Sequence, residues 1–259
     1  MSGDVRVARK LEFYAPHTRM GKDAVVQGKL QEAMVHFKDD FMYDTMATDR
    51  WAASVGNGGN APAIVVGANG LVNIATNAGA SDVTEMYGEA LWYPRQHITI
   101  EARLYLANIT TVSAAFGLAN AAANTNDEIV VSIGGSDALT LGTNIVDAAC
   151  FLFDTAADTD RWFAVSTVGG AAAEGGVLAA GITPVNSTFE VFKIDVDIDG
   201  NATFYRNGAV VKYIATAVAA ANALRPYLAI KTRTTAARTL FCDYIEVWQN
   251  RAETATVVW

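Results

Sequence analysis

The segment from Phe189 to Trp248 constrains the fold most, because its apolar and polar side chains alternate with a period of two. Such alternation predicts half-buried β-strands. The pairs Asp199-Gly200 and Asn207-Gly208 predict tight hairpin turns, since these residues accept the positive φ that such turns require. We expect the first strand to bury one set of side chains and expose the other: Phe192, Ile194, Val196 and Ile198 against Lys193, Asp195, Asp197 and Asp199.

Short segments of the same kind recur along the rest of the chain, at the spacing of about 8–12 residues that is typical of β-sandwiches. The only helix-like stretch in the body is the alanine-rich segment 215–223, and Pro226 follows it closely, so we interpret it as a loop with one helical turn at most. The expected strands are 63–66, 71–76, 83–91, 97–106, 112–119, 128–134, 145–153, 161–168 and 176–181.

The length of 259 residues is enough for one large sandwich core. No apolar run approaches the ~18 residues of a membrane span, and no secretion signal opens the chain, so we expect no membrane partner. Cys150 and Cys242 lie in apolar strand patterns. Two interpretations stay open for them, buried free thiols or a single disulfide, and two cysteines alone cannot form a metal cage.

Charge is unevenly distributed along the chain. Residues 1–38 carry seven basic and four acidic side chains, a net charge of +3. The remaining residues carry a net charge of −11, so the whole chain has a net charge of −8. This pattern predicts a basic N-terminal arm on an acidic body, and the acidic body argues against a nucleic-acid partner. The docking residues expected in the arm are Arg6, Arg9, Lys10, Arg19 and Lys22.

The expected organisation has three parts. Residues 1–37 form a docking arm, either extended or with a short amphipathic helix around 23–36, where Val26, Leu30 and Met34 recur every four residues. Residues 38–250 form the β-sandwich, and 251–259 form a C-terminal tail. Because the arm has little apolar surface of its own, we expect it to order only against a partner and the sandwich to fold without residues 1–37.

Several weak motifs, taken in order, resemble the concanavalin A-like lectin/glucanase (LamG-type) jelly roll, in particular the versions found in tailed-bacteriophage virion structural proteins. The resemblance covers roughly residues 38–250 and implies an all-β, two-sheet antiparallel jelly-roll sandwich, here with an extended N-terminal arm. The motifs are Asp39-Asp40-Phe41, Trp51, Glu101-Ala102-Arg103 within the strand 97–106, Phe116-Gly117-Leu118, the run from Asp195 to Tyr205, and Asp243-Tyr244-Ile245-Glu246-Val247.

Hydrolytic chemistry is not visible in these motifs. Glucanases of this fold resemble one another in a Glu-x-Asp-x-x-Glu strand, and retaining hydrolysis needs two carboxyls about 5–5.5 Å apart. The nearest acidic pairs here are Glu85 with Glu89 and Asp243 with Glu246, and neither has that spacing. The sequence therefore predicts a protein that is not an enzyme and needs no cofactor.

Metal-binding patterns are also incomplete. Asp195, Asp197 and Asp199 are spaced like the start of an EF-hand loop, but Arg206 occupies the position of the bidentate glutamate. The interpretation favoured is a solvated strand face followed by a turn, with a calcium site of another type as the alternative. His17, His36 and His97 fall in no metal-ligand spacing, so we expect no metal site.

Aromatic side chains are the remaining candidates for ligand binding, because sugars stack on exposed rings. The candidates are Trp92, Tyr93, Tyr105, Trp162 and Tyr205. The resemblance implies a non-enzymatic virion structural protein, a head-decoration, cement or fibre-type component of a tailed phage assembled in the host cytoplasm. Its arm would dock on capsid or other virion proteins, with homo-oligomer formation expected. The alternative is a carbohydrate-binding module that attaches to host or environmental glycans.

Overall fold

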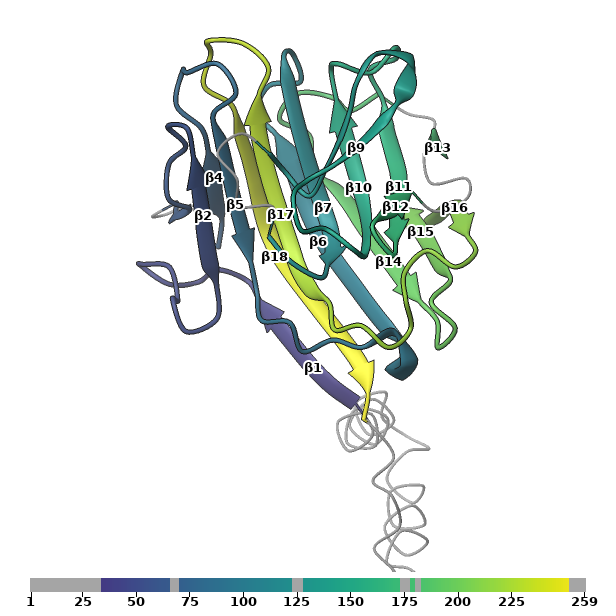
Figure 1. The fold of residues 1–259 in the computed structure, drawn as a ribbon. Coiled ribbons are helices and arrows are strands. Elements are labelled where there is room, and N and C mark those ends of the chain that lie inside the picture. The colour runs from purple at the N-terminus through teal and green to yellow at the C-terminus, as the bar shows by residue number, and fades with distance from the viewer. Residues whose placement is uncertain (1–33, 66–69, 123–127, 173–177, 180–182, 252–259) are drawn as a thin grey trace, which may run out of the picture.

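The computed structural model describes residues 34–65, 70–122, 128–172, 178–179 and 183–251. The chain is all-β, with 52% strand and 3% helical residues, and its two large antiparallel sheets pack as a sandwich (Figure 1). This confirms the predicted fold class, a jelly-roll-type sandwich. Within the described residues, no helix has the length and apolar character needed to cross a bilayer.

Sheet A has the strand order β16-β15-β14-β6-β18-β4-β3, and β1 pairs with the second half of β18. In Figure 1 the long strand β18 runs to the lower end of the sandwich, with β1 beside it. The strands are β1 (Met34–Asp39), β3 (Ala63–Ile64), β4 (Val72–Ala75), β6 (Ile98–Leu106), β14 (Glu190–Val196), β15 (Ala202–Arg206), β16 (Ala209–Ile214) and β18 (Thr239–Asn250).

Sheet B has the order β12-β11-β10-β7-β17-β5-β2, with β13 also paired to β11. A separate hairpin, β8 (Val131–Ile133) with β9 (Leu139–Leu141), carries the short 3-10 turn η2 (Gly135–Asp137), and η1 (Pro94–Gln96) precedes β6. The strands of sheet B are β2 (Ala52–Gly56), β5 (Val83–Tyr87), β7 (Val112–Ala119), β10 (Ala148–Asp154), β11 (Trp162–Val168), β12 (Ala171–Ala172), β13 (Leu178–Ala179) and β17 (Arg225–Thr232).

The main core lies between the two sheets. As the alternation predicted, Phe192, Ile194 and Val196 are fully buried in it. Ile198 is the exception: it is 58% exposed, because β14 ends at Val196 and the chain then turns. A second apolar cluster lies on the other side of sheet B, where β7, β10, β11 and β17 pack against residues of the β8–β9 hairpin. Sheet B is therefore apolar on both faces.

Strand β1 lies where the sequence predicted the end of a helix and the end of the docking arm, so both predictions are wrong for its residues. Met34, Val35 and His36, the last residues of the helix expected at 23–36, are strand residues that pair with Asn250, Gln249 and Trp248. The same strand includes Met34–Phe37, which the sequence analysis assigned to the docking arm. Backbone pairing with β18 decides the conformation here, whereas the helical spacing is a local signal. Residues 1–33 lie outside the described residues.

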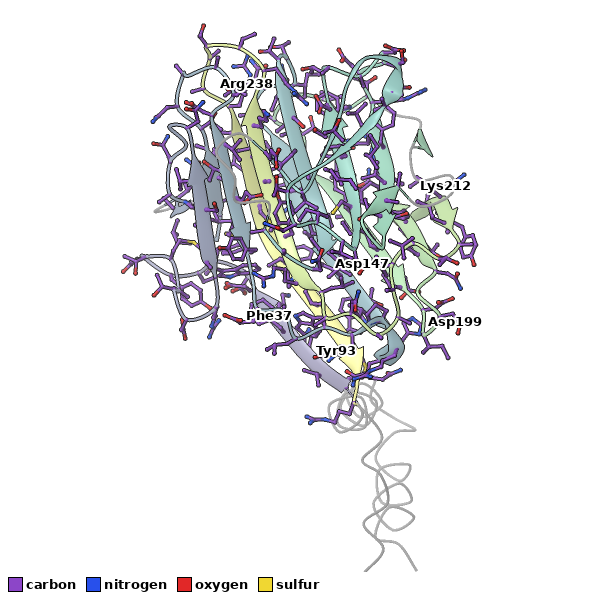
Figure 2. The ribbon with its side chains drawn as sticks, in the orientation of Figure 1. Phe37, Tyr93, Asp147, Asp199, Lys212 and Arg238 are labelled. Carbon is purple, nitrogen blue, oxygen red and sulfur yellow. The ribbon has the colours of Figure 1, made fainter. Side chains whose placement is uncertain are left out.

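Other expectations are confirmed. The segment 215–223 is an irregular loop, and buried Asp147 accepts hydrogen bonds from it, from Ala219 N at 2.9 Å and from Asn222 Nδ2 at 2.5 Å (Figure 2). Cys150 and Cys242 are buried free thiols, one in each sheet, so the disulfide alternative is wrong. Three short or edge strands, β2, β9 and β12, were not expected from the sequence.

Candidate functional site

The two outer faces of the sandwich differ in what covers them. The outer face of sheet B packs beneath the β8–β9 hairpin, where Ile129, Val131 and Ile133 are at most 1% exposed. Figure 1 shows β9 in front of β7 and β10. The outward side chains of sheet A are instead partly exposed along β6, β14, β15 and β18, except Thr99 of β6, which is only 5% exposed. Sheet A therefore offers the more accessible surface for a ligand.

Hydrogen bonds from buried polar groups hold the β8–β9 hairpin against sheet B. Tyr227 Oη donates to Glu85 Oε1 at 2.5 Å and accepts from Val130 N at 3.0 Å. At the other end Asp154 Oδ2 accepts from Ile133 N at 3.1 Å and pairs with Arg233. Burial, then the neighbouring Glu85 charge and hydrogen bond, raise the pKa of Tyr227 well above its usual value, so its hydroxyl stays protonated.

The acidic pairs considered for hydrolysis do not form a catalytic site. Glu85 is 1% exposed and engaged by Tyr227, and Glu89 is exposed beyond the end of β5 at Tyr87. On sheet A, Asp243 Oδ2 accepts from Arg103 Nη1 at 2.5 Å, and Glu246 Oε1 lies 2.7 Å from His36 Nε2. Among the described residues, no group of three or more histidine, cysteine or acidic side chains is arranged to hold a metal ion.

The EF-hand-like aspartates have other structural roles. Asp197 closes the turn after β14: its Oδ1 accepts from Asp199 N at 3.0 Å and Asn201 N at 2.9 Å, and its Oδ2 accepts from Asn201 Nδ2 at 2.8 Å. Burial alone would raise the pKa of Asp197, but the hydrogen bonds from Asn201 and Asp199 outweigh it and hold the pKa below its usual value. This geometry supports the expected solvated face with a turn.

Arg206, at the glutamate position of the EF-hand pattern, does not lie beside the three aspartates. Arg206 is only 6% exposed and pairs with buried Glu190 instead of facing the aspartates. The strand register explains this, because Arg206 pairs with Phe192, whereas Asp195 pairs with Thr203 at the other end of the hairpin. The guanidinium therefore belongs to the core side of sheet A.

The strand register places one row of outward residues across six strands of sheet A, and we call it the terminal row. Tyr213 pairs with Thr203, Thr203 with Asp195, Asp195 with Thr99, Thr99 with Trp248, and Trp248 with His36. Paired residues of adjacent strands project from the same face. The row lies near the end of the sandwich where Figure 2 labels Phe37, Tyr93 and Asp199. It consists of His36, Trp248, Thr99, Asp195, Thr203 and Tyr213.

Aromatic rings near both ends of the terminal row are available to a ligand. Tyr213 is 54% exposed on the edge strand β16, and among the described residues neither its ring nor its hydroxyl has a partner. Trp248 is half-buried, and its ring meets that of His36 edge-on at 6.5 Å between centroids. Between them, Asp195 Oδ1 accepts from Thr99 Oγ1 at 2.7 Å and lies 2.8 Å from His97 Nε2, which orients the carboxylate.

The neighbouring rows of sheet A are engaged in contacts of their own. Lys193 Nζ lies 4.1 Å from the centroid of the Tyr205 ring, and Arg103 lies 4.0 Å from that of Phe189. Tyr105 stacks on Phe241 at 4.8 Å and meets Phe189 edge-on at 4.6 Å. Their ring faces are therefore partly covered by other side chains, unlike that of Tyr213.

The five aromatic residues that the sequence suggested for glycan binding differ in burial and in their contacts. Trp162 is 1% exposed and donates to Glu190 Oε2, so it is a core residue and cannot stack on a sugar; Trp92, at 6%, is also in the core. Tyr105 and Tyr205 lie on the outer face of sheet A but contact other side chains. Tyr93 lies in the loop before η1, beneath Arg95. The arm residues Arg6, Arg9, Lys10, Arg19 and Lys22 lie outside the described residues.

Tyr213 was missed by the sequence analysis. Its signal is weak, because Ala209-Val210-Val211-Lys212-Tyr213-Ile214 does not alternate cleanly between apolar and polar residues. The register shift in the pairing of β15 with β16, between Phe204 and Tyr205, makes the side-chain pattern of β16 irregular. Only the pairing with Thr203 shows that Tyr213 shares a face with Asp195.

No family model and no curated protein matches the sequence, but many solved structures share the fold. The Emp47p carbohydrate recognition domain superposes with a TM-score of 0.58 at 10% identity, covering 85% of this chain and 98% of that one. A protein of unknown function from Shewanella oneidensis MR-1, SO2946, gives 0.52 at 13% identity over 86% and 90%.

A third structure, LamAcat from Zobellia galactanivorans, gives a TM-score of 0.50 at 13% identity over 86% of this chain and 100% of that one. The fold is that of the concanavalin A-like lectins and glucanases. At these identities the comparison establishes architecture, and the neighbours with this architecture include both carbohydrate-binding domains and glycoside hydrolases.

Proposed function

We propose that this protein is a non-catalytic carbohydrate-binding module that binds glycans on the outer face of sheet A. The observation that carries the proposal is Tyr213, an uncommitted ring that is 54% exposed and shares a row with the Asp195 carboxylate. Protein sites for sugars combine a ring, which stacks on an apolar sugar face, with polar groups placed to bond hydroxyls. The carbohydrate recognition domain among the structures of the same fold supports this reading.

The spacing along the row suits a sugar between Tyr213 and Asp195. These residues lie on β16 and β14, with Thr203 of β15 between them, so their backbones are about 9–10 Å apart. Thr203 is small and has no hydrogen-bond partner among the described residues. A sugar above Thr203 would meet the Tyr213 ring on one side and the carboxylate on the other.

Binding to a panel of soluble polysaccharides, by affinity electrophoresis and calorimetry, tests the proposal. We expect at least one of laminarin, yeast mannan, xylan and κ-carrageenan to bind. Tyr213→Ala should weaken binding about tenfold or more, which corresponds to about 1.4 kcal/mol. Tyr43→Ala is the matched control, because Tyr43 is a partly exposed tyrosine outside the terminal row that contacts Arg50. Absence of binding across the panel, or equal losses in both variants, would contradict the proposal.

A reducing-sugar assay on the same polymers separates binding from hydrolysis. Glu101 and Glu246 are cross-strand neighbours on this face, but Glu101 Oε1 accepts from Tyr244 Oη at 2.7 Å and Glu246 Oε1 lies 2.7 Å from His36 Nε2. Because both carboxylates are held by other side chains, we expect no release of new reducing ends. If the protein hydrolyses one of the polymers and Asp195→Asn abolishes that hydrolysis, the protein is a glycosidase and the proposal of a non-catalytic module is wrong.

The virion role inferred from the sequence resemblance stays a separate proposal, as do homo-oligomer formation and docking through the basic arm. It would place the binding module on a phage particle and give it a role in attachment. Deletion of residues 1–33, which spares strand β1, tests the docking. We expect the shortened protein to fold and bind glycan but to be absent from the particle; normal incorporation would contradict docking by the arm.

A further inference from the structure

The second ring of the terminal row, Trp248, is far from the first. The strand order β16-β15-β14-β6-β18 separates Tyr213 from Trp248 by four strand spacings. At about 4.8 Å per spacing, the two positions are about 19 Å apart. Both residues project from the outer face of sheet A, so one ligand could contact both only if it ran across the strands.

The surface between the two rings is polar. Thr203 and Asp195 follow one another along the row, and His97 lies beside Asp195. Thr99 comes next, but it is only 5% exposed and its hydroxyl donates to Asp195, so it supports the carboxylate and is not open to a ligand. Hydroxyl, carboxylate and imidazole groups can all exchange hydrogen bonds with sugar hydroxyls. A ligand complementary to the row therefore has an apolar ring face near each end and hydroxyl groups in the middle.

The distance between Tyr213 and Trp248 sets the length of carbohydrate chain that can contact both. A pyranose unit, built from bonds of about 1.5 Å, extends a chain by about 5 Å, so about four units are needed to reach from Tyr213 to Trp248. We propose that the terminal row binds a single extended oligosaccharide chain across the strands, with Tyr213 and Trp248 as its two end contacts. This inference rests on the proposed function and narrows its ligand class from sugars in general to internal segments of a chain.

The twist of sheet A favours a soluble chain over a flat crystalline polymer. Neighbouring strands are rotated by about 20–25°, so the surface turns by about 80–100° between β16 and β18. Two rings on so twisted a surface cannot both lie flat on one planar crystal face. The ligand expected is therefore a soluble, separate chain, and a flat crystalline polymer should bind poorly.

Calorimetry with laminari-, cello- and manno-oligosaccharides, from disaccharide to hexasaccharide, tests the inference. In the series that binds, we expect the hexasaccharide to bind at least about tenfold more tightly than the disaccharide, because only the longer chain reaches both rings. Trp248→Ala should remove that gain, so that the hexasaccharide binds no more than about twofold more tightly than the disaccharide. Trp248→Phe, which keeps a ring, should restore most of it, and Tyr43→Ala should have no effect.

Some results of these experiments would contradict the extended-chain inference alone, and others would contradict the proposed function as well. If a series binds with equal affinity at every length, or if Trp248→Ala leaves the hexasaccharide affinity unchanged, the extended-chain inference is wrong and the binding module stands. If no oligosaccharide and no polysaccharide binds, both are wrong. Preferential binding to microcrystalline cellulose over soluble cellohexaose would also overturn the inference. Thermal melting of each variant shows whether a loss reflects unfolding.

Discussion

At the scale of the residue, Asp197 shows how a motif that looks like a metal site works as a turn. Its carboxylate accepts three hydrogen bonds from Asp199 and Asn201, which lower its pKa against the effect of burial. A carboxyl whose pKa is lower in the folded than in the unfolded state stabilises the fold above the unfolded value, here near 3.8, and loses that contribution as pH falls through the folded pKa.

Asp197→Ala should therefore lower the free energy of unfolding by about 1 kcal/mol at neutral pH. The difference from the wild type should shrink as the pH falls from 3.8 through the lower pKa of the folded state, below which the Asp197 carboxyl is protonated in both states. Urea unfolding at several pH values measures both effects. Asp199→Ala is the control, since the exposed Asp199 side chain makes no hydrogen bond among those found. A difference that grows in acid would contradict this account.

At the scale of the element, the β8–β9 hairpin depends on a partly buried ion pair. Asp154 is fully buried and bonds Arg233, Ser113 Oγ and Ile133 N, so it links the hairpin to β7 and β17. Asp154→Ala should cost about 3 kcal/mol of unfolding free energy, because it leaves the Arg233 guanidinium without its carboxylate and the buried Ile133 N–H without its acceptor. Asp137→Ala, which removes a more exposed pair with Arg161 and one hydrogen bond from Asp158 N, should cost only about 1 kcal/mol. Equal losses would show that Asp154 has no special role.

Strand β1 sets where the chain can be shortened. Phe37 packs edge-on against Trp51 at 5.5 Å between ring centroids, and buried Asp39 accepts from Trp51 Nε1 at 2.8 Å. Deletion of residues 1–33 should leave the melting temperature nearly unchanged. Deletion of residues 1–39 should lower it by several degrees, since about 1 kcal/mol corresponds to about 2–4 °C at this size. The expectation that 1–37 can be removed without cost is thus replaced by a boundary at Met34. Equal melting temperatures for both deletions would contradict it.

At the scale of the whole molecule, sheet B joins two apolar clusters into one unit. Neighbouring residues of one strand serve both: Phe116 belongs to the main core and Ala115 to the cluster under the hairpin. We therefore expect both clusters to unfold together. Each contains a buried thiol, Cys242 in the main core and Cys150 under the hairpin, and burial raises the pKa of Cys150 to about 12.

Thiol labelling in a urea series can follow the two clusters separately. Both cysteines should be unreactive in the native protein, because a buried thiol with a raised pKa is not a nucleophile. They should become reactive over the same narrow range of urea in which tryptophan fluorescence changes. Labelling of Cys150 at clearly lower urea than Cys242 would show that the hairpin cluster opens independently.

The alternation along 98–106 and 190–196 was enough to predict strands, the buried side of each and the sandwich class. This is a local property, since a strand with one buried face must place apolar side chains at every second residue. The same pattern predicted Tyr105 and Tyr205 as outward-facing rings. It could not separate the fully buried Trp162 from an exposed ring, because in sheet B both faces are covered and the alternation loses its meaning.

Composition and spacing by themselves determined an all-β chain without a recognisable catalytic or metal motif. Tertiary structure decided which face is open, through the hairpin that covers sheet B, and it decided which residues meet on the open face. Tyr213, Asp195 and Trp248 are far apart in the sequence and form one row only through the pairing of β16, β15, β14, β6 and β18. Strand order is set by packing and long-range hydrogen bonding, and no local pattern of side chains encodes it.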